Sequence, residues 1–387
     1  MKILRLFNDW QQKKSREENN GYGGCGYYRV IKLAEQLSPE HDVTLWGNEW
    51  KKKYIELGSD NVKFYEHIFS TYDLVWMHYS DNDQLFKWMY VAAKKYGSKL
   101  VMDIDDNFLD LDEGNPAKSH IGRGSYKRTA LATILSFCDA ITVSTEPLKA
   151  RLAKHFMDTH KIEKEIFVVP NFNDVEDWNK VEMPENPGKN GIVIGYMGSV
   201  SHKDDLEMVL PSIKTIMEKY PHVGFQLMGQ LTFDGARDIF EDWDQKLRSR
   251  IHLISPTDNM KDFPQWFAIQ YWDIGIAPLI DSSFNRCKSH IKWMEYAMRK
   301  IPTVASEVYP YCEPIHGRAT IVHNETGFLC RPDEWVDTLS MLIEAPGLRD
   351  KIGQQAYDYV LDKWQYKDAK PEILDIVEKI AQIEKEE

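Results

Sequence analysis

Basic and acidic residues gather in one stretch, residues 284–306, in an order that suits phosphate binding. Arg286, Lys288 and Lys292 lie ahead of or within the first turns of a predicted helix that carries Glu295. The unpaired backbone N–H groups at the start of a helix and the helix dipole both favour an anion. We therefore expect a phosphate at this helix, held by the basic side chains and by the first residues of the helix, Ser289, His290 and Ile291.

The same stretch continues into a buried strand. Lys300-Ile301-Pro302 ends the helix, and Thr303-Val304-Ala305 is short and apolar, as expected of a strand in an α/β sheet. A second interpretation is that the lysines form a solvated helix face and that Glu295 is a surface ion-pair partner.

A cluster of carboxylates follows another predicted strand. Residues 99–107 run from an apolar segment directly into Asp103, Asp105 and Asp106. In open parallel sheets ligands bind beyond the carboxyl ends of strands, which makes Asp105 and Asp106 candidate catalytic residues. Their mutual repulsion should raise one pKa and help one of them act as a base. Helix capping and binding of a hard cation are alternative roles for such a run.

A glycine cluster lies near the N-terminus, between a first predicted strand at residues 2–7 and a helix. It contains Gly23, Gly24 and Gly26 and is followed by Arg29. Strand, glycine-rich turn and helix together bring backbone amides close to a phosphate or a sugar, and Arg29 would add an anion contact. The alternative is a flexible surface loop.

Strand and helix patterns alternate along the whole chain, and this predicts an α/β protein with mainly parallel sheets. The pattern is interrupted at residues 182–191, where Pro, Gly and polar residues predict an interdomain linker. It then restarts with an apolar strand at residues 192–197 and a turn at Gly198-Ser199.

These motifs resemble the group 1 glycosyltransferases of the GT-B fold. Glu295 matches the second Glu of the family's two-Glu signature, whereas Cys287 stands at the place of the first; Asn171, the Gly198 loop and Gly327 match other family positions. The resemblance implies that Glu295 binds the ribose of a nucleotide-sugar and that the helix start binds its diphosphate. The family's Arg and Lys after the Gly198 turn are replaced by Ser199 and Asp204, so we expect Arg286, Lys288 or Lys292 to supply the positive charge.

The implied architecture has two Rossmann-like domains whose parallel sheets face each other across a cleft. We predict an acceptor-binding domain at residues 1–180, a nucleotide-sugar-binding domain at residues 181–355, and terminal helices at residues 356–387 that cross back to the first domain. The family usually carries a His-Asp pair where this sequence has Asp105-Asp106. The implied reaction is sugar transfer, hexosyl transfer from UDP-glucose or a similar UDP-sugar, to an acceptor hydroxyl, with retained configuration and without a metal or other cofactor.

Composition excludes several classes. The chain has 387 residues and a net charge of −12, which argues against a protein that coats nucleic acid or an anionic membrane. No apolar run is long enough to span a bilayer. The five cysteines are scattered and lack paired metal-ligand spacing, so we predict reduced thiols, no zinc and a cytoplasmic location.

The acceptor is the open question. Lys118, His120 and Arg123 belong to a basic cluster that would line the acceptor side. A saccharide or a glycolipid is the default acceptor, and a hydroxymethylated DNA base is a second possibility because of the local basic clusters. Two other functions also remain open: a non-catalytic subunit that binds a nucleotide-sugar, and a sugar-nucleotide epimerase or phosphorylase built on the same fold.

Overall fold

The computed structural model describes residues 1–6, 23–47, 49–79, 82–182, 191–229, 239–257 and 259–384. The chain forms two compact units. Unit 1 comprises Met1–Asp110, Ser119–Asn171 and Tyr366–Glu387, and unit 2 comprises Leu111–Lys118 and Phe172–Gln365. Residues 183–190, most of the predicted linker, lie outside the described residues.

Unit 1 is built on a six-stranded parallel sheet with the order β2-β1-β3-β4-β5-β6. Its strands are β1 (Lys2–Leu6), β2 (Asp42–Trp46), β3 (Leu74–His78), β4 (Lys99–Ile104), β5 (Ala140–Val143) and β6 (Ile166–Val168). Strand β3 is buried at every position, because a strand in a parallel sheet is covered on both faces and therefore consists mostly of apolar residues.

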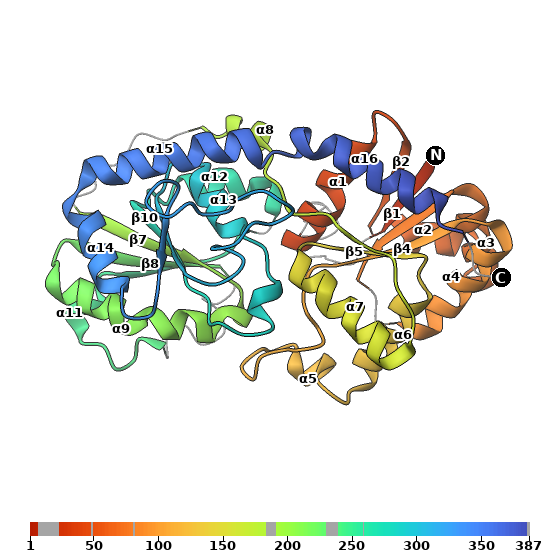
Figure 1. The fold of residues 1–387 in the computed structure, drawn as a ribbon, viewed down its shortest axis with the longest axis horizontal. Helices are drawn as coiled ribbons and strands as arrows, with labels where there is room; N and C mark the ends of the chain where they lie inside the picture. Colours follow the sequence, from red (N-terminus) through yellow and green to blue (C-terminus); the bar gives the residue numbers. More distant parts are fainter. Residues whose placement is uncertain are drawn as a thin grey trace. The chain divides into compact units, whose positions relative to one another are not determined.

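Helices cover this sheet. They are the π-helix η1 (Gly26–Ile31), α1 (Lys32–Leu37), α2 (Glu49–Glu56), α3 (Asn61–Thr71), α4 (Asp83–Tyr96), α6 (Tyr126–Phe137), α7 (Glu146–His160) and α16 (Tyr366–Gln382). The short helix α5 (Lys118–Ile121) has its first residue in unit 2 and the others in unit 1. The terminal helix α16 packs against α1 (Figure 1). Its Tyr366 hydroxyl donates to the Tyr28 carbonyl at 2.7 Å. The last helix of the chain is therefore part of the first sheet's unit.

Unit 2 contains the second six-stranded parallel sheet, with the order β12-β11-β10-β7-β8-β9. Its strands are β7 (Ile192–Met197), β8 (Val223–Met228), β9 (Ile251–Ile254), β10 (Ile274–Ala277), β11 (Thr303–Ser306) and β12 (Phe328–Cys330). The predicted α/β class with two parallel sheets is confirmed.

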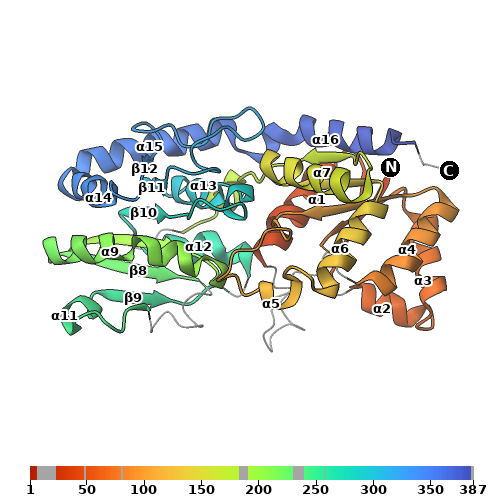
Figure 2. The ribbon, with the colours of Figure 1, turned by 60° about the horizontal axis from the view of Figure 1, so that its bottom comes forward.

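The helices of unit 2 are α8 (Val175–Asn179), η2 (Val200–His202), α9 (Lys203–Lys219), α11 (Gln245–Arg248), η4 (Met260–Asp262), α12 (Phe263–Ala268), η5 (Asn285–Cys287), α13 (Ile291–Ala297), α14 (Trp335–Glu344) and α15 (Pro346–Lys363). Helix α9 runs beside β8 and also packs against α14 (Figure 2). Helix α13 packs against β10, β11 and α15. Among the described residues, every helix is too short or too polar to cross a membrane.

Candidate functional site

Unit 2 brings two positive charges close together in the lysine pair, Lys288 and Lys292. Lys288 follows η5 and Lys292 is the second residue of α13. Both Nζ atoms lie 3.3 Å from the same atom, Nε2 of His202. Two ammonium groups that share one acceptor are close neighbours, and a polyvalent anion placed against them would relieve their mutual repulsion.

His202 is held in a state that lets it accept from both lysines. An ammonium group only donates hydrogen bonds, so Nε2 must be the unprotonated nitrogen and Nδ1 must carry the proton. Nδ1 then donates to the Asp205 carboxylate at 2.7 Å. Burial, followed by the charges of Lys288 and Lys292, lowers the pKa of His202 well below its usual value, so the imidazole is neutral and does not cancel the charge of the lysine pair.

Asp205, in the first turn of α9, links His202 to the loop that follows β10. Its Oδ1 accepts from the backbone N–H of Ile280 at 2.8 Å and from Nδ2 of Asn285 at 2.7 Å. Burial raises the pKa of Asp205 to about 6, against the opposing effects of the Ile280 N–H, the two lysines and Asn285. Asn285 is fixed in turn because its backbone N–H donates to Ser282 Oγ at 3.1 Å.

Helix α13 presents Lys292 and Glu295, which are three residues apart and so lie on the same side of the helix. Glu295 is only 5% exposed, and this excludes the surface ion-pair alternative. The helix is fastened at two points: Trp293 Nε1 donates to the Thr326 carbonyl at 2.8 Å, and the Tyr296 hydroxyl donates to the Ile276 carbonyl at 3.1 Å.

Gly275 in β10 makes room for the Tyr296 ring. A Cβ at position 275 would lie 2.5 Å from a ring carbon of Tyr296. We expect Gly275→Ala to lower the free energy of unfolding by about 1–3 kcal/mol, because the ring and α13 must shift. Urea unfolding checks this, with Gly347→Ala as the control because no atom lies within 4 Å of a Cβ at position 347. Equal stability of the two variants would contradict the proposed close packing.

The segment before α13 forms a separate short helix and an extended residue. The segment Asn285–Cys287 is a short 3-10 helix, the chain then becomes extended at Lys288, and α13 begins only at Ile291 and has 7 residues. Arg286 and Lys288 therefore precede the helix, and Arg286 bonds the Asp281 carboxylate through both Nε and NH2. The positive charge at this site comes mainly from side chains, since so short a helix contributes only a weak dipole.

His290, one of the residues expected to contact the donor, has its side chain in the core of unit 2. It is fully buried, its ring centroid is 4.0 Å from that of Trp364, and neither ring nitrogen has a hydrogen-bond partner among the described residues. Burial lowers the pKa of His290 to about 3. The expected contribution of this residue to donor binding is therefore confined to its backbone.

This burial predicts a pH dependence of stability. An unfolded histidine has a pKa of about 6.5, so the unfolded state binds a proton below that pH while the folded state does not until about pH 3. The contribution of neutral His290 to the free energy of unfolding is therefore fully present above pH 6.5 and is lost as the pH falls towards 3. Between pH 7 and pH 5 we expect His290 to account for a loss of about 2 kcal/mol. Urea unfolding of His290→Leu at both pH values should show a smaller loss than the wild type, and identical losses would refute this account.

Gly198 and Ser199 form the turn after β7. A Cβ at Gly198 would lie 2.7 Å from the Tyr196 hydroxyl, so a side chain at this position would force a local shift. Ser199 is the N-cap residue of η2, and its hydroxyl lies 2.8 Å from that of Ser201. The turn leads directly to His202, and this places the predicted Gly198-Ser199 loop next in sequence to the support of the lysine pair.

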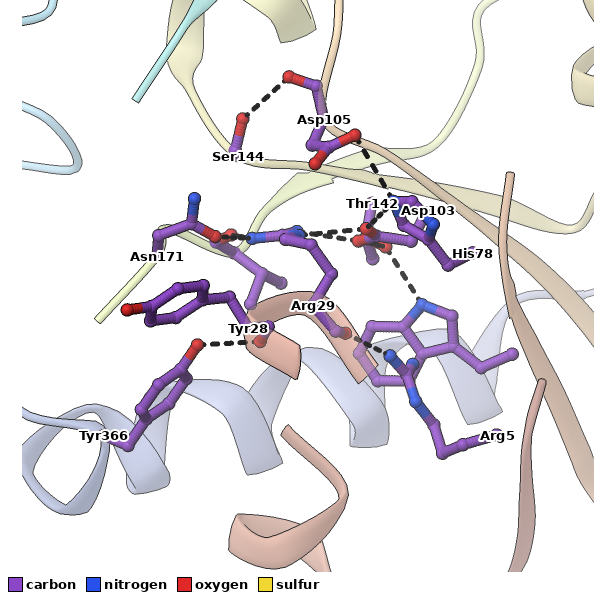
Figure 3. A network of polar contacts seen from close by, with 12 residues as sticks. Arg5, Tyr28, Arg29, His78, Asp103, Asp105, Thr142, Ser144, Asn171 and Tyr366 are labelled. Carbon is purple, nitrogen blue, oxygen red and sulfur yellow. Dashed lines mark hydrogen bonds and ion pairs between the residues drawn. The ribbon is translucent and has the colours of Figure 1, made fainter. Parts of the chain in front are cut away.

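In unit 1 the segment that was predicted to be a glycine-rich loop is helical from Gly24 onward. Gly24 and Cys25 are helical and Gly26–Ile31 is a π-helix, so Arg29 points into the unit and is 1% exposed. Its Nε and NH2 bond the Asp103 carboxylate at 2.9 and 2.7 Å, and NH1 donates to Asn171 Oδ1 at 3.0 Å and to the Val169 carbonyl (Figure 3). Arg29 therefore has its donors engaged inside unit 1 and does not offer them to an anion.

The candidate catalytic carboxylates lie directly after β4, as predicted. Asp105 is partly buried and its Oδ1 lies 3.3 Å from Nε2 of His78 (Figure 3), whereas Asp106 is exposed. Burial alone would raise the pKa of Asp105, but His78, with smaller contributions from Cys25 and Arg29, holds it well below its usual value. The upward shift expected from repulsion is thus not found at Asp105.

The expected acceptor residues lie on the short helix α5 and just after it. Lys118 is half-buried and forms an ion pair with Glu113, while His120 and Arg123 are exposed. Lys118 falls in unit 2 and the other two in unit 1.

Sequence reasoning missed three residues that organise these sites: His202, Asp205 and His78. The first two form an H-x-x-D pair directly after the Gly198 turn, and that spacing could have indicated a hydrogen-bonded pair on one turn. His78 is the last residue of an apolar strand, and it lies next to Asp105, which directly follows the neighbouring strand. Only the pairing of the two strands brings these side chains together.

Comparison with known proteins gives relatives by structure alone. No protein-family model and no curated protein sequence matches the chain. Among solved structures, Anabaena HepE bound to UDP is 15% identical with a TM-score of 0.61, and the match covers 98% of this chain and 100% of HepE. A structure of HepE with UDP-glucose matches with a TM-score of 0.60.

Two further solved structures are similar. TarM is 14% identical with a TM-score of 0.58 over 84% of this chain and 58% of TarM, so this chain corresponds to little more than half of that protein. The trehalose-6-phosphate synthase OtsA is 12% identical with a TM-score of 0.58, over 99% of this chain and 100% of OtsA. Two parallel six-stranded sheets in two units, matched over nearly the whole chain, identify the fold as the GT-B fold.

Proposed function

We propose that this protein is a glycosyltransferase that transfers a sugar from a nucleotide diphosphate-sugar, a UDP-sugar, to an acceptor hydroxyl. The observation that carries the proposal is the lysine pair, Lys288 and Lys292, gathered on neutral His202 within a GT-B fold. A solved structure of the same fold binds UDP, and another contains UDP-glucose. A diphosphate carries the closely spaced negative charges that two adjacent ammonium groups complement.

In this proposal unit 2 binds the donor. Lys288 and Lys292 bind the diphosphate, and Glu295, on the same side of α13 as Lys292, accepts hydrogen bonds from the ribose hydroxyls. The backbone at Ser289, His290 and Ile291 and the Gly198-Ser199 turn complete the phosphate environment. Arg286 is a peripheral contact, since it is paired with Asp281.

The chemistry required is stabilisation of the leaving group. When the bond between the sugar and the β-phosphate breaks, negative charge grows on the departing UDP, and fixed ammonium groups stabilise that charge without reorganisation. The lysine pair can thus supply the positive charge that a divalent cation supplies in other transferases. We expect that adding Mg²⁺ or Mn²⁺ leaves UDP affinity unchanged, as isothermal titration would show. A large metal-dependent gain in affinity would instead indicate a metal at the diphosphate.

The acceptor side is proposed to comprise residues of unit 1 together with Lys118 of unit 2. Asp105 and Asp106, just after β4, remain the predicted catalytic carboxylates, and the exposed His120 and Arg123 with Lys118 remain the predicted acceptor contacts. A saccharide acceptor is the main proposal, and retention of configuration is the stereochemistry the proposal assigns. A hydroxymethylated DNA base is the second acceptor to test.

A mass-spectrometric transfer screen tests the proposal. A panel of nucleotide-sugars is offered with glycan and glycolipid acceptors and with DNA that contains hydroxymethylated bases, for the wild type and for Glu295→Ala. Transfer by the wild type that is lost in the variant establishes the activity and names donor and acceptor. Nucleotide binding without transfer or hydrolysis would instead identify a binding subunit, and a changed donor sugar without any acceptor would identify an epimerase.

A salt titration separates the two acceptor classes. Binding to DNA through Lys and Arg contacts weakens steeply as salt rises, because counterions are released. Absence of salt-sensitive DNA binding would remove the DNA acceptor and leave the saccharide.

A further inference from the structure

Three side chains of metal-ligating type meet at the carboxyl edge of the sheet in unit 1. Cys25 is the N-cap residue of η1, His78 is the last residue of β3, and Asp105 directly follows β4. One ligand atom from each, Cys25 Sγ, His78 Nε2 and an Asp105 oxygen, lies within 4.8 Å of the other two. Residues separated by up to 80 positions in the sequence are thus gathered into one cluster.

The spacing within the cluster suits ligands of one metal ion. His78 Nε2 and Asp105 Oδ1 are 3.3 Å apart (Figure 3). This pair is also within hydrogen-bonding distance, and the Cys25 side chain hydrogen-bonds Asp105 as well. Two ligands bound at about 2.0–2.2 Å to a tetrahedral ion are separated by about 3.3–3.6 Å, which is the spacing seen here.

Burial and charge are also suitable. His78 is buried, the Asp105 side chain is 22% exposed and Cys25 is partly exposed, so the cluster is sheltered without being fully enclosed. The neighbouring Arg29 and Asp103 neutralise each other in a direct ion pair at 2.7 Å. A thiolate and a carboxylate therefore match a divalent cation with no charge left uncompensated.

The local backbone structure also favours a ligand site at this cluster. Cys25 opens a π-helix, a rare element that is concentrated at functional sites. The cluster lies beyond the carboxyl ends of two adjacent parallel strands, where ligands of α/β sheets bind.

We infer that Cys25 Sγ, His78 Nε2 and the Asp105 carboxylate bind one divalent transition-metal ion of the Zn²⁺ type and leave a coordination position open. Thiolate and imidazole select zinc and its neighbours, while Mg²⁺ and Ca²⁺ prefer oxygen ligands alone. Binding releases the protons held by the thiol and the imidazole. All three ligands belong to unit 1, whereas the lysine pair belongs to unit 2. The metal site shares Asp105 with the proposed catalytic carboxylates, so a bound ion would give Asp105 the role of a ligand and leave Asp106 as the candidate base; metal binding is measured without any transfer assay, so the two proposals can fail separately.

The experiment uses the full chain, stripped with a chelator and titrated with Co²⁺ and then Zn²⁺. We expect one Co²⁺ per chain with a thiolate-to-metal charge-transfer band in the near ultraviolet, and displacement of Co²⁺ by Zn²⁺. Cys25→Ser should abolish the band, and His78→Gln and Asp105→Asn should weaken binding by at least about tenfold. The control is Cys312→Ser, since Cys312 is a partly buried free thiol of unit 2.

Circular dichroism confirms that each variant is folded, and the partly exposed Cys25 is the safest position to change. Native mass spectrometry gives a second readout, one added Zn²⁺ in the wild type and in Cys312→Ser but none in Cys25→Ser. No stoichiometric binding by the wild type, or a band that survives in Cys25→Ser, would overturn the inference and leave an ordinary His78–Asp105 ion pair.

Discussion

Replacing both Lys288 and Lys292 by alanine should weaken UDP binding by at least about 100-fold. A hydrogen bond to a charged group contributes about 1.5–3 kcal/mol, and each 1.4 kcal/mol is a factor of ten in affinity. Each single variant should therefore lose about tenfold or more. Isothermal titration with UDP measures the effect, and titration with uridine, which has no phosphate, should show no change.

Lys203→Ala is the matched control for the lysine pair. Lys203 is in the same region, directly after His202, but its side chain is exposed and pairs with Glu207 at 3.6 Å. Its loss should leave UDP affinity within about twofold, because surface ion pairs contribute little. If Lys203→Ala and the double variant had the same effect, the charge of the region as a whole, and not the lysine pair, would determine binding.

Replacing His202 tests whether the lysine pair requires a neutral acceptor. In His202→Gln a side-chain amide oxygen can take the place of Nε2, so we expect UDP affinity to stay within a few-fold of the wild type. In His202→Glu a carboxylate of nearly the same size would pair with both lysines and cancel their charge. We expect this variant to lose at least about tenfold in UDP affinity.

The decisive quantity is the difference in UDP affinity between the two variants, because glutamine and glutamate differ in charge and hardly in shape. Thermal unfolding of both proteins confirms that each is folded. A merely structural role of His202 would make the variants lose affinity equally, or lose stability without a difference in UDP binding. Asp205→Asn is informative beside them, because it removes the acceptor for Nδ1–H and leaves the lysines in place.

The sequence was a good guide to the elements and a partial guide to the site. The strand at 192–197 has the predicted bounds, because an uninterrupted apolar run between turn residues is typical of a buried parallel strand. The start of the helix around Glu295, predicted at residues 289–291, lies at Ile291. Arg286 and Lys288 precede it in a separate turn, where Asn285 and the Ile280 N–H bond Asp205.

The interior positions of charged groups could not be read from the sequence. Arg29 was expected to face an anion, but Asp103, which is 74 positions away, captures its guanidinium inside unit 1. Cysteine spacing indicated no metal site because it compares near neighbours in sequence. The Cys25, His78 and Asp105 cluster arises only when β3 and β4 pair and η1 packs at their ends.

The common acceptor of Lys288 and Lys292 also has a thermodynamic consequence. A lysine side chain loses up to about 2 kcal/mol of rotamer entropy when it is fixed. Because His202 already orders both side chains, much of this loss occurs on folding of the chain and not on arrival of the ligand. Nucleotide association should accordingly carry a small entropic penalty at the protein, and the dissociation rate would then respond to changes at His202 more strongly than the association rate.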